Sequence, residues 1–319
     1  MDESSCTRHG DLIPHHCADL NCKGNSTMPG DTPGARFRRL FQQGPFVCMG
    51  AHDPLTARVA EAAGARALYV SGFALSAVIA GAPDFGVLTQ TEMFVAIRRI
   101  CRVTSLPVFA DADTGYGGPL EARRTINLWE EAGAAALHLE DQEAPKKCGH
   151  FAGKRLIPTA DMVQKLHAML DARRDPGFFV IARTDAIAVE GIDKAIERLR
   201  AYAATGADAL YADAPESREH MMALSSGLSD LGLPILFNMV RSGKSPVLTM
   251  QEAARLGFAF ALCPVESMLT EHRAVSEMMR RFLAEQTTAS IADGLTPFDE
   301  FNRFIGLDEM AELNRRYGA

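Results

Sequence analysis

Short apolar runs alternate with longer segments of helical period from about residue 45 onward. Runs that are apolar almost throughout are typical of strands in a parallel sheet covered on both faces. The eight runs are FVCMGA (46–51), ALYVSG (67–72), PVFADAD (107–113), ALHLED (136–141), FFVIARTD (178–185), ALYADA (209–214), PILFNM (234–239) and FALCPV (260–265). Thr89 and Thr249 are each followed three residues later by a glutamate, which is the spacing of a helix capping box. The pattern predicts an α/β chain whose eight βα units close into a (β/α)8 TIM barrel.

A doubly wound open sheet is the alternative fold, but no G-x-G-x-x-G motif follows the first run. Residues 1–35 are rich in Gly, Pro, Ser, Asn and Asp and have no apolar period, so we expect a disordered leader there. We assign residues 36–290 to the catalytic barrel. The amphipathic stretch 291–319 exceeds what a barrel needs, and we expect a helical tail that packs on a neighbouring subunit.

The leader also contains cysteines and histidines, which raises the alternative of a zinc site. These residues are Cys6, His9, His15, His16, Cys17 and Cys22. Their spacings fit no paired-knuckle pattern, and no strand or helix signal surrounds them, so the disordered leader is favoured.

Composition excludes several classes of partner. Lys and Arg number 33 against 40 Asp and Glu, and the net charge of −7 without a basic stripe argues against nucleic acid and anionic membranes. No apolar run approaches the ~20 residues that span a bilayer, and the N-terminus lacks the apolar region of a secretory signal. The seven cysteines follow no disulfide framework, so we expect a cytoplasmic protein.

Polar side chains follow the predicted strands at the ends where barrel active sites form. The acids there are Asp111 and Asp113 after the third run, Glu140 and Asp141 after the fourth, Asp185 after the fifth and Asp213 after the sixth. Carboxylates that converge on one barrel mouth repel each other unless a cation lies among them. Ligand sets made only of oxygen favour Mg²⁺, with Mn²⁺ second, over zinc. We therefore expect a metal site rather than a series of helix caps.

Arg183 emerges among these acids, and its planar guanidinium suits a substrate carboxylate. A structural ion pair with Asp111 or Glu140 is the alternative role for this arginine. The turn Ser71-Gly72-Phe73 follows the second run, and its backbone N–H groups and hydroxyl are suited to cradling an anion.

Cys148 lies in the segment Pro145-Lys-Lys-Cys-Gly-His150, directly after the fourth run. Neighbouring cations lower a thiol pKa, and such a thiol can exchange a proton near neutral pH. The lysines beside it are unsuited to burial, which argues against a role as a space-filling side chain. Cys48, Cys101 and Cys263 lie in apolar surroundings, where we expect inert thiols.

Six short motifs carry these candidates: Ser71-Gly72, Pro83-Asp84-Phe85-Gly86, Asp111-Ala-Asp113-Thr-Gly-Tyr-Gly, Glu140-Asp141-Gln142, Lys146-Lys147-Cys148-Gly149-His150 and Ala182-Arg183-Thr184-Asp185. Together, over about residues 38–290, they resemble the isocitrate lyase/phosphoenolpyruvate mutase superfamily. The Lys-Lys-Cys-Gly-His loop is similar to that of the lyase branch, whereas phosphonomutases carry a different loop without the cysteine. The resemblance implies a (β/α)8 barrel that swaps its C-terminal helices between the subunits of a homotetramer.

The resemblance also implies a role for each site residue. Asp111 would bind Mg²⁺ directly, and Asp84, Asp113 and Glu140 would act through metal-bound waters. The substrate would be held by Ser71, Gly72, Phe73, Lys147, Gly149, Arg183, Asp213 and Asn238. The catalytic residues would be Cys148 as the acid/base, with Arg183, Tyr69 and His150.

Two segments depart from the 2-methylisocitrate lyases. Ala212-Asp213-Ala214 lies where those enzymes have Pro-Glu-Ala, and Asn238 is followed by Met-Val-Arg-Ser-Gly-Lys-Ser-Pro. The second pattern is closer to the dimethylmalate lyase, oxaloacetate hydrolase and petal death protein group. Phe73 is also bulkier than the glycine of methylisocitrate lyases. These departures favour a smaller 2-hydroxy or 2-oxo diacid over a tricarboxylate.

We therefore expect a Mg²⁺-dependent carbon–carbon lyase that acts on a small carboxylic acid. It would cleave a 2-hydroxy di- or tricarboxylate, of the 2-alkylmalate or 2-methylisocitrate type, into a 2-oxo acid such as pyruvate and a second carboxylate. Cys148 would protonate the enediolate, and the loop 143–152 would close over the substrate. The alternatives are an oxaloacetate hydrolase or decarboxylase, a phosphonomutase of the carboxyphosphonoenolpyruvate type, and an inert barrel used as a binding protein.

Overall fold

Eight parallel strands form a closed barrel in the computed structural model, which describes residues 30–149, 151–241 and 243–318. The strands are β1 (Phe46–Gly50), β2 (Ala67–Val70), β3 (Val108–Asp111), β4 (Ala136–Glu140), β5 (Phe179–Thr184), β6 (Ala209–Ala212), β7 (Ile235–Asn238) and β8 (Phe260–Cys263). Each strand pairs with the next, and β1 closes the barrel against β8, with Phe46 opposite Phe260. Every strand falls within one of the eight predicted apolar runs, so the (β/α)8 barrel is confirmed.

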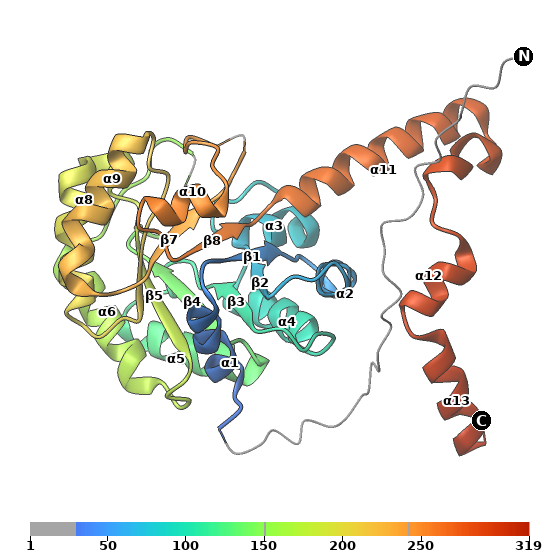
Figure 1. The fold of residues 1–319 in the computed structure, drawn as a ribbon, viewed down its shortest axis with the longest axis horizontal. Helices are drawn as coiled ribbons and strands as arrows, with labels where there is room; N and C mark the ends of the chain where they lie inside the picture. Colours follow the sequence, from blue (N-terminus) through green and yellow to red (C-terminus); the bar gives the residue numbers. More distant parts are fainter. Residues whose placement is uncertain (1–29, 150, 242, 319) are drawn as a thin grey trace, which may run out of the picture. The chain divides into compact units, whose positions relative to one another are not determined.

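Helices follow the strands and cover the outside of the barrel, as α4, α5, α6, α8 and α9 show in Figure 1. The α-helices are α1 (Pro33–Leu40), α2 (Pro54–Ala62), α3 (Gly72–Leu75), α4 (Gln90–Cys101), α5 (Pro119–Ala132), α6 (Thr159–Ala172), α7 (Ile187–Glu190), α8 (Ile192–Ala203), α9 (Arg218–Leu228), α10 (Met250–Arg255), α11 (Glu266–Glu285), α12 (Phe298–Phe304) and α13 (Leu307–Tyr317). Three segments are 3₁₀ helices, η1 (Phe41–Gln43), η3 (Ser229–Leu231) and η4 (Thr288–Gly294), and η2 (Ser76–Ala80) is a π-helix. Both predicted capping boxes are present, at Thr89 and Thr249.

Strand β2 shows why the predicted strands are apolar at every position. Successive side chains point to opposite faces of a strand. Ala67 and Tyr69 belong to the cluster inside the barrel, whereas Leu68 and Val70 belong to the larger cluster between the strands and the helices. All four residues are buried, because the sheet has no face toward solvent.

Helix α1 closes the end of the barrel at which the strands begin. The ring of Phe37 is fully buried, with its centroid 5.8 Å from that of Phe46, 5.3 Å from Phe179 and 6.2 Å from Phe260. The helix begins at Pro33, capped by the Thr32 hydroxyl, so its first residues lie inside the stretch 1–35 that the sequence assigned to a leader. The rest of that stretch, residues 1–29 with the alternative zinc site, lies outside the described residues.

Residues from Glu277 onward form a second compact unit, which consists of the end of α11, η4, α12 and α13. Arg281 links two of these elements, since its guanidinium contacts the Ser290 carbonyl and lies 3.0 Å from Asp293. Many large apolar side chains of this unit are exposed, among them Leu283, Phe298, Met310 and Tyr317. No helix in the described part of the chain is long and apolar enough to cross a membrane.

Replacing Phe37 with alanine tests the closure of the barrel base. The substitution removes a fully buried ring that touches the first residues of several strands, so we expect a loss of about 3–5 kcal/mol in unfolding free energy. Urea titration followed by circular dichroism measures this loss. A loss below about 1 kcal/mol would contradict the assignment of α1 to the barrel core.

Candidate active site

The strand ends that carry the predicted site residues surround a cavity of about 270 Å³. Barrel enzymes place their reactive groups at this end of the strands. Predicted site residues that line the cavity are Tyr69, Ser71, Phe73, Asp84, Cys148, Gly149, Arg183, Asp213 and Asn238. They come from the ends of strands β2, β5, β6 and β7 and from the loops after β2 and β4. The structure therefore gathers most of the predicted residues around one pocket.

The predicted metal-binding acids lie beside this cavity, and a lysine lies among them. Asp84, Asp111, Asp113 and Glu140 are all buried. The ammonium of Lys146 lies 2.7 Å from Asp84 Oδ2 and 2.8 Å from Asp113 Oδ1, and it is itself buried. Lys146 thus compensates part of the negative charge of these acids.

The donor set of this acid cluster fits a divalent metal ion. Glu140 Oε1 and Asp84 Oδ1 are buried oxygens without a hydrogen-bond partner, so each retains lone pairs for a ligand. The turn at Gly72 also lies close, because a Cβ there would be 2.9 Å from Asp113 Oδ1 and 3.0 Å from Asp111 Oδ2. Among the described residues, however, no three acids, histidines or cysteines form a ready-made metal cluster. Carboxylate-only ligands are those that Mg²⁺ and Mn²⁺ accept.

Burial and charge act in opposite directions on these carboxyl groups. Burial opposes ionisation of Asp111, yet the positive charges of His138, Lys146 and Arg183 lower its pKa to about 2. Burial raises the pKa of Asp113 to about 6 despite the Lys146 ammonium, and burial also raises the pKa of Glu140. A bound cation would reverse these upward shifts, since it favours the charged form of each carboxylate.

The Ser71-Gly72-Phe73 turn holds an anion of the chain itself. The Gly72 N–H donates to Asp111 Oδ2 at 3.1 Å, so the turn fixes one of the predicted metal ligands. Asp111 Oδ1 accepts a second backbone hydrogen bond, from the N–H of Asp113 at 2.9 Å. Ser71 and Phe73 remain in the cavity wall, where a substrate can reach them.

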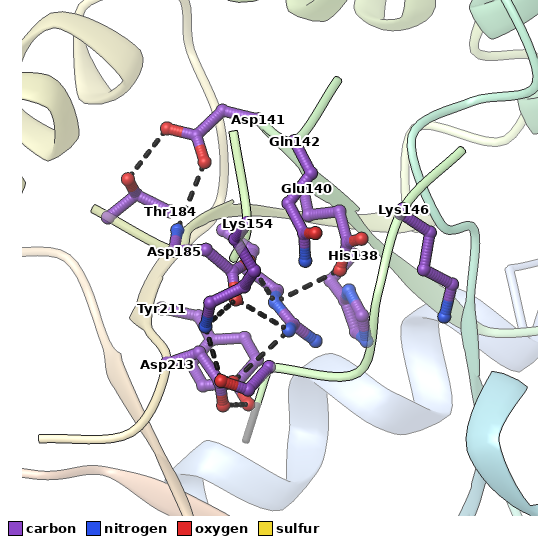
Figure 2. A network of polar contacts seen from close by, with 12 residues as sticks. His138, Glu140, Asp141, Gln142, Lys146, Lys154, Thr184, Asp185, Tyr211 and Asp213 are labelled. Carbon is purple, nitrogen blue, oxygen red and sulfur yellow. Dashed lines mark hydrogen bonds and ion pairs between the residues drawn. The ribbon is translucent and has the colours of Figure 1, made fainter. Parts of the chain in front are cut away.

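Arg183, at the end of β5, is surrounded by three carboxylates. Its Nε lies 3.2 Å from Glu140 Oε2 and donates to Asp185 Oδ2 at 3.0 Å. Its Nη2 donates to Asp185 Oδ1 at 3.1 Å and to Asp213 Oδ2 at 3.2 Å. In the view of Figure 2, Lys154, Asp185 and Asp213 lie on one side of Glu140, and Lys146 lies on the other. The structural pair with Glu140 is therefore present, and the guanidinium also lines the cavity.

The loop after β4 carries Cys148 to the cavity wall. Its base is closed by the Gln142 side chain, which accepts from the Lys147 N–H at 3.0 Å and donates to the Lys147 carbonyl at 2.8 Å. The Cys148 N–H donates to the Asp84 carbonyl at 3.1 Å. The loop thus brings a half-buried cysteine beside the acid cluster.

Gly149 packs directly against Asp213 and Arg183, which are called the charged floor of the cavity below. A Cβ at this position would lie 1.5 Å from Asp213 Oδ2 and 2.7 Å from Arg183 Nη2. Any other residue here would require either the loop or the buried Asp213 and Arg183 side chains to shift. The glycine of the Lys-Lys-Cys-Gly-His segment is therefore required by contact.

Tyr69 and Asn238, which line the cavity, each form a hydrogen bond within the site. The Tyr69 hydroxyl lies 2.8 Å from Nε2 of His138, a fully buried ring whose pKa burial lowers to about 4. Asn238 donates from Nδ2 to Asp213 Oδ1 at 3.2 Å, while its buried Oδ1 has no hydrogen-bond partner. Asn238 Oδ1 is thus free to accept from a substrate hydroxyl.

Lys147, which the sequence predicts to hold the substrate, is not among the residues that line the cavity. Its ammonium donates to the Gly153 carbonyl at 3.0 Å, and its role in substrate binding stays a prediction. The lysine that lines the cavity is Lys146, which the sequence analysis treated only as a neighbour of Cys148 and as unsuited to burial. His150 lies outside the described residues.

Apolar side chains also line the cavity, and apart from Phe73 the sequence did not predict them; they are called the apolar wall below. This wall is formed by Phe73, Phe151, Val240, Leu262, Pro264, Val265 and Leu269. These side chains come from the loops after β2, β4 and β7, from the end of β8 and from α11. The cavity is therefore lined both by charged and polar side chains and by apolar side chains.

Known proteins match this chain over most of its length. The family model described as phosphoenolpyruvate phosphomutase matches residues 37–283. A 2,3-dimethylmalate lyase of Eubacterium barkeri is 38% identical over 89% of this chain and 97% of its own length. A 2-methylisocitrate lyase of Aeropyrum pernix is 37% identical over 90% of this chain and 93% of its own length.

Solved structures match the same region. Oxaloacetate acetylhydrolase in complex with 3,3-difluorooxalacetate has a TM-score of 0.83 and 31% identity, over 90% of this chain and 98% of that chain. Phosphonopyruvate hydrolase in complex with oxalate and Mg²⁺ has a TM-score of 0.80 and 28% identity, over 90% of this chain and all of that chain.

Replacing Gly149 with alanine tests the contact between the loop and the charged floor. The new Cβ would overlap Asp213, so either the loop or the Asp213 and Arg183 side chains must shift out of place, and we expect turnover to fall at least ~100-fold. The thermal unfolding midpoint should stay within a few degrees, because the loop contributes no core residue. Gly118→Ala is the matched control, since the nearest atom to its Cβ is Glu121 Oε2 at 3.5 Å. Full turnover of the Gly149 variant would refute the contact.

Proposed function

Because the chain belongs to the phosphoenolpyruvate mutase/isocitrate lyase superfamily and its relatives are lyases, we propose that it cleaves the C2–C3 bond of a 2-alkylmalate. The family match and the named relatives confirm the resemblance drawn from the sequence motifs. They also confirm the assignment to a carbon–carbon lyase. The substrate, the metal and the role of each residue are our proposal.

The cavity is lined by both polar and apolar side chains, and this observation supports the choice of a 2-alkylmalate as substrate. Arg183, Asn238 and Ser71 offer polar contacts to the carboxylate and hydroxyl groups of a diacid. Val240, Leu262 and the other apolar wall residues offer burial to alkyl groups at C2 or C3. Each methylene buried there contributes about 0.8 kcal/mol. Oxaloacetate has no alkyl substituent, so it would leave this wall without a partner.

We propose that Asp111 holds Mg²⁺ directly and that Asp84, Asp113 and Glu140 complete its surroundings. Support comes from the unpartnered carboxylate oxygens of Asp84 and Glu140, and from the Lys146 ammonium that lies between Asp84 and Asp113. A solved neighbour, the phosphonopyruvate hydrolase, is a complex with Mg²⁺. The ion would supply Lewis-acid stabilisation of negative charge on the substrate oxygens.

In the proposed reaction the chain first binds and orients the diacid. The Arg183 guanidinium, held in a fixed plane by Asp185 and Asp213, receives a substrate carboxylate. The C2 hydroxyl then gives its proton to solvent, and C2 becomes the carbonyl carbon of a 2-oxo acid as the C2–C3 bond breaks. The electrons of the broken C2–C3 bond pass into the other fragment, which becomes an enediolate. Fixed cationic groups that stabilise this enediolate supply the largest share of catalysis.

Cys148 completes the proposed reaction as the acid. Its thiol gives a proton to the carbon of the enediolate, which becomes the second carboxylate product, and the thiolate regains a proton from solvent. The side chain lies in the cavity wall on a loop that covers the site, as this role requires. Tyr69 stays neutral, because burial raises its pKa, and it acts as a hydrogen-bonding group of the cavity.

The alternatives make different demands on these residues. An oxaloacetate hydrolase or decarboxylase would bind its substrate through the same charged residues, but its substrate has no alkyl group to bury against the apolar wall. A phosphonomutase has no use for Cys148. A binding barrel has no need of the buried acid cluster, which costs free energy unless each charge is compensated. The alkylmalate lyase is the function that uses all three features.

The exposed apolar side chains of the C-terminal unit support the proposal that it packs on a neighbouring subunit. Phe298 is 84% exposed and Tyr317 is 74% exposed, which is unusual for large apolar residues. We propose a homotetramer assembled through this unit.

A panel of acids tests the proposed function. Purified protein with Mg²⁺ is offered 2,3-dimethylmalate, 2-methylisocitrate and oxaloacetate, and the products are identified by mass spectrometry. We expect pyruvate from dimethylmalate with a kcat/KM at least ~10-fold above that for oxaloacetate, because buried methyl groups discriminate on this scale. Excess EDTA should abolish turnover and added Mg²⁺ should restore it. Oxaloacetate as the best substrate would refute the alkylmalate proposal, and full activity in EDTA would refute the metal.

Replacing Cys148 with serine tests the proton donor. The hydroxyl has a much higher pKa than the thiol, so we expect kcat to fall by about 10²–10⁴, the range for a general acid. KM should change less than about threefold, since Arg183 and the acid cluster are untouched. Cys101→Ser, at the end of α4, is the matched control and should keep full activity. A Cys148→Ser enzyme within about threefold of the normal kcat would remove Cys148 from the mechanism.

A further inference from the structure

Lys154 lies on the return limb of the loop that carries Cys148, and its side chain turns inward. Only 1% of that side chain is exposed, although the neighbouring Arg155 is 75% exposed. The Lys154 ammonium donates to the Gly149 carbonyl and lies 3.0 Å from Asp185 Oδ1. It thus joins the tip of the loop to the end of strand β5.

Asp185 is a rigid anchor for this lysine. Its two carboxylate oxygens accept from Arg183 Nε at 3.0 Å and Nη2 at 3.1 Å. Its backbone N–H donates to Asp141 Oδ1 at 3.0 Å. Figure 2 shows Lys154 beside Asp185, on the same side of the network as Asp213. The anchor therefore belongs to the barrel and not to the loop.

Lys154 compensates part of the charge of Asp185, because the Arg183 guanidinium that also donates to Asp185 is shared with Glu140 and Asp213. Charge compensation accounts for a cation beside Asp185, but it does not require a contact with the loop. The second contact of the ammonium, with the Gly149 carbonyl, links it to the residue that directly follows Cys148.

We propose that Lys154 is a positioning residue for Cys148. Its ammonium fastens the Gly149 carbonyl to Asp185 and so holds the cysteine loop down on the charged floor of the cavity. Without this contact the loop is still tied by Gln142 at its base, by Lys146 to Asp84 and by the Cys148 N–H to the Asp84 carbonyl, but its return limb has lost this link to the barrel. The effect on turnover rests on the proposed function, whereas the effect on the loop does not.

Two substitutions remove the ammonium. Lys154→Met keeps the apolar stem, and Lys154→Gln keeps a polar head but loses the charge and some reach. Both leave Asp185 paired with Arg183, and circular dichroism checks that they fold. The ligand-free proteins are treated with iodoacetamide, and modification of Cys148 is followed by peptide mass spectrometry. Hydrogen exchange of peptides that cover residues 143–153 gives a second measurement of the same loop.

We expect Cys148 in both variants to be modified at least ~10-fold faster than in the unaltered protein, and the loop amides to exchange faster. With the preferred acid, kcat should fall ~10–100-fold while KM stays within about threefold. Arg155→Met is the matched control, because it removes a neighbouring exposed cation that pairs only with the exposed Glu143. It should stay within twofold of the unaltered protein in every measurement.

Modification and exchange rates within twofold of the unaltered protein would overturn the proposal, whatever happens to kcat. If no acid of the panel is turned over by the unaltered protein but the loop still loosens in both variants, the proposed function fails and the role of Lys154 stands. The two ideas are therefore refuted by different results.

Discussion

Charge compensation in a buried barrel mouth governs the whole site. Seven carboxylates around the mouth are buried: Asp84, Asp111, Asp113, Glu140, Asp141, Asp185 and Asp213. Each must find a cation, a hydrogen-bond donor or a proton, since an uncompensated charge in such a place is costly. Lys146 and Arg183 each pair with two or more of these acids. Lys154 pairs with Asp185 and links it to the backbone carbonyl of Gly149. The acids still outnumber the buried cations beside them, which leaves the mouth receptive to a further positive charge.

The sequence predicted the barrel and the location of the site because both follow from local pattern. A strand buried on both faces must be apolar throughout, and all eight such runs were visible. The acids could be placed in one cluster without knowledge of distances, because parallel strands in a barrel all end on the same side. Asp111, Asp213 and Arg183 lie at the mouth for this reason alone.

Other parts of the site depend on contacts that no local pattern encodes. The path of the loop after β4 determines that Lys146, and not Lys147, lines the cavity. The sequence alone does not distinguish these two adjacent lysines. The apolar wall joins residues as distant as Phe73 and Leu269, each of which is an ordinary apolar residue of its own segment. Lys154 resembles any surface lysine until the fold places it over Asp185. In each case tertiary contacts set the position of the side chain, and the residue type and its local sequence do not predict that position.

The pairing of β1 with β8 has a consequence for how the chain is made. Phe46 lies opposite Phe260 and Cys48 opposite Leu262, so the ring cannot close until more than two hundred residues after its first strand have been synthesised. A nascent chain that has produced β1 to β7 has two open sheet edges, both rich in apolar side chains. Such long-range pairing is slow and leaves partly folded chains prone to aggregation. The intermediate that holds β1 to β7 is therefore the one with two open sheet edges, and pairing of the eighth strand removes both of them.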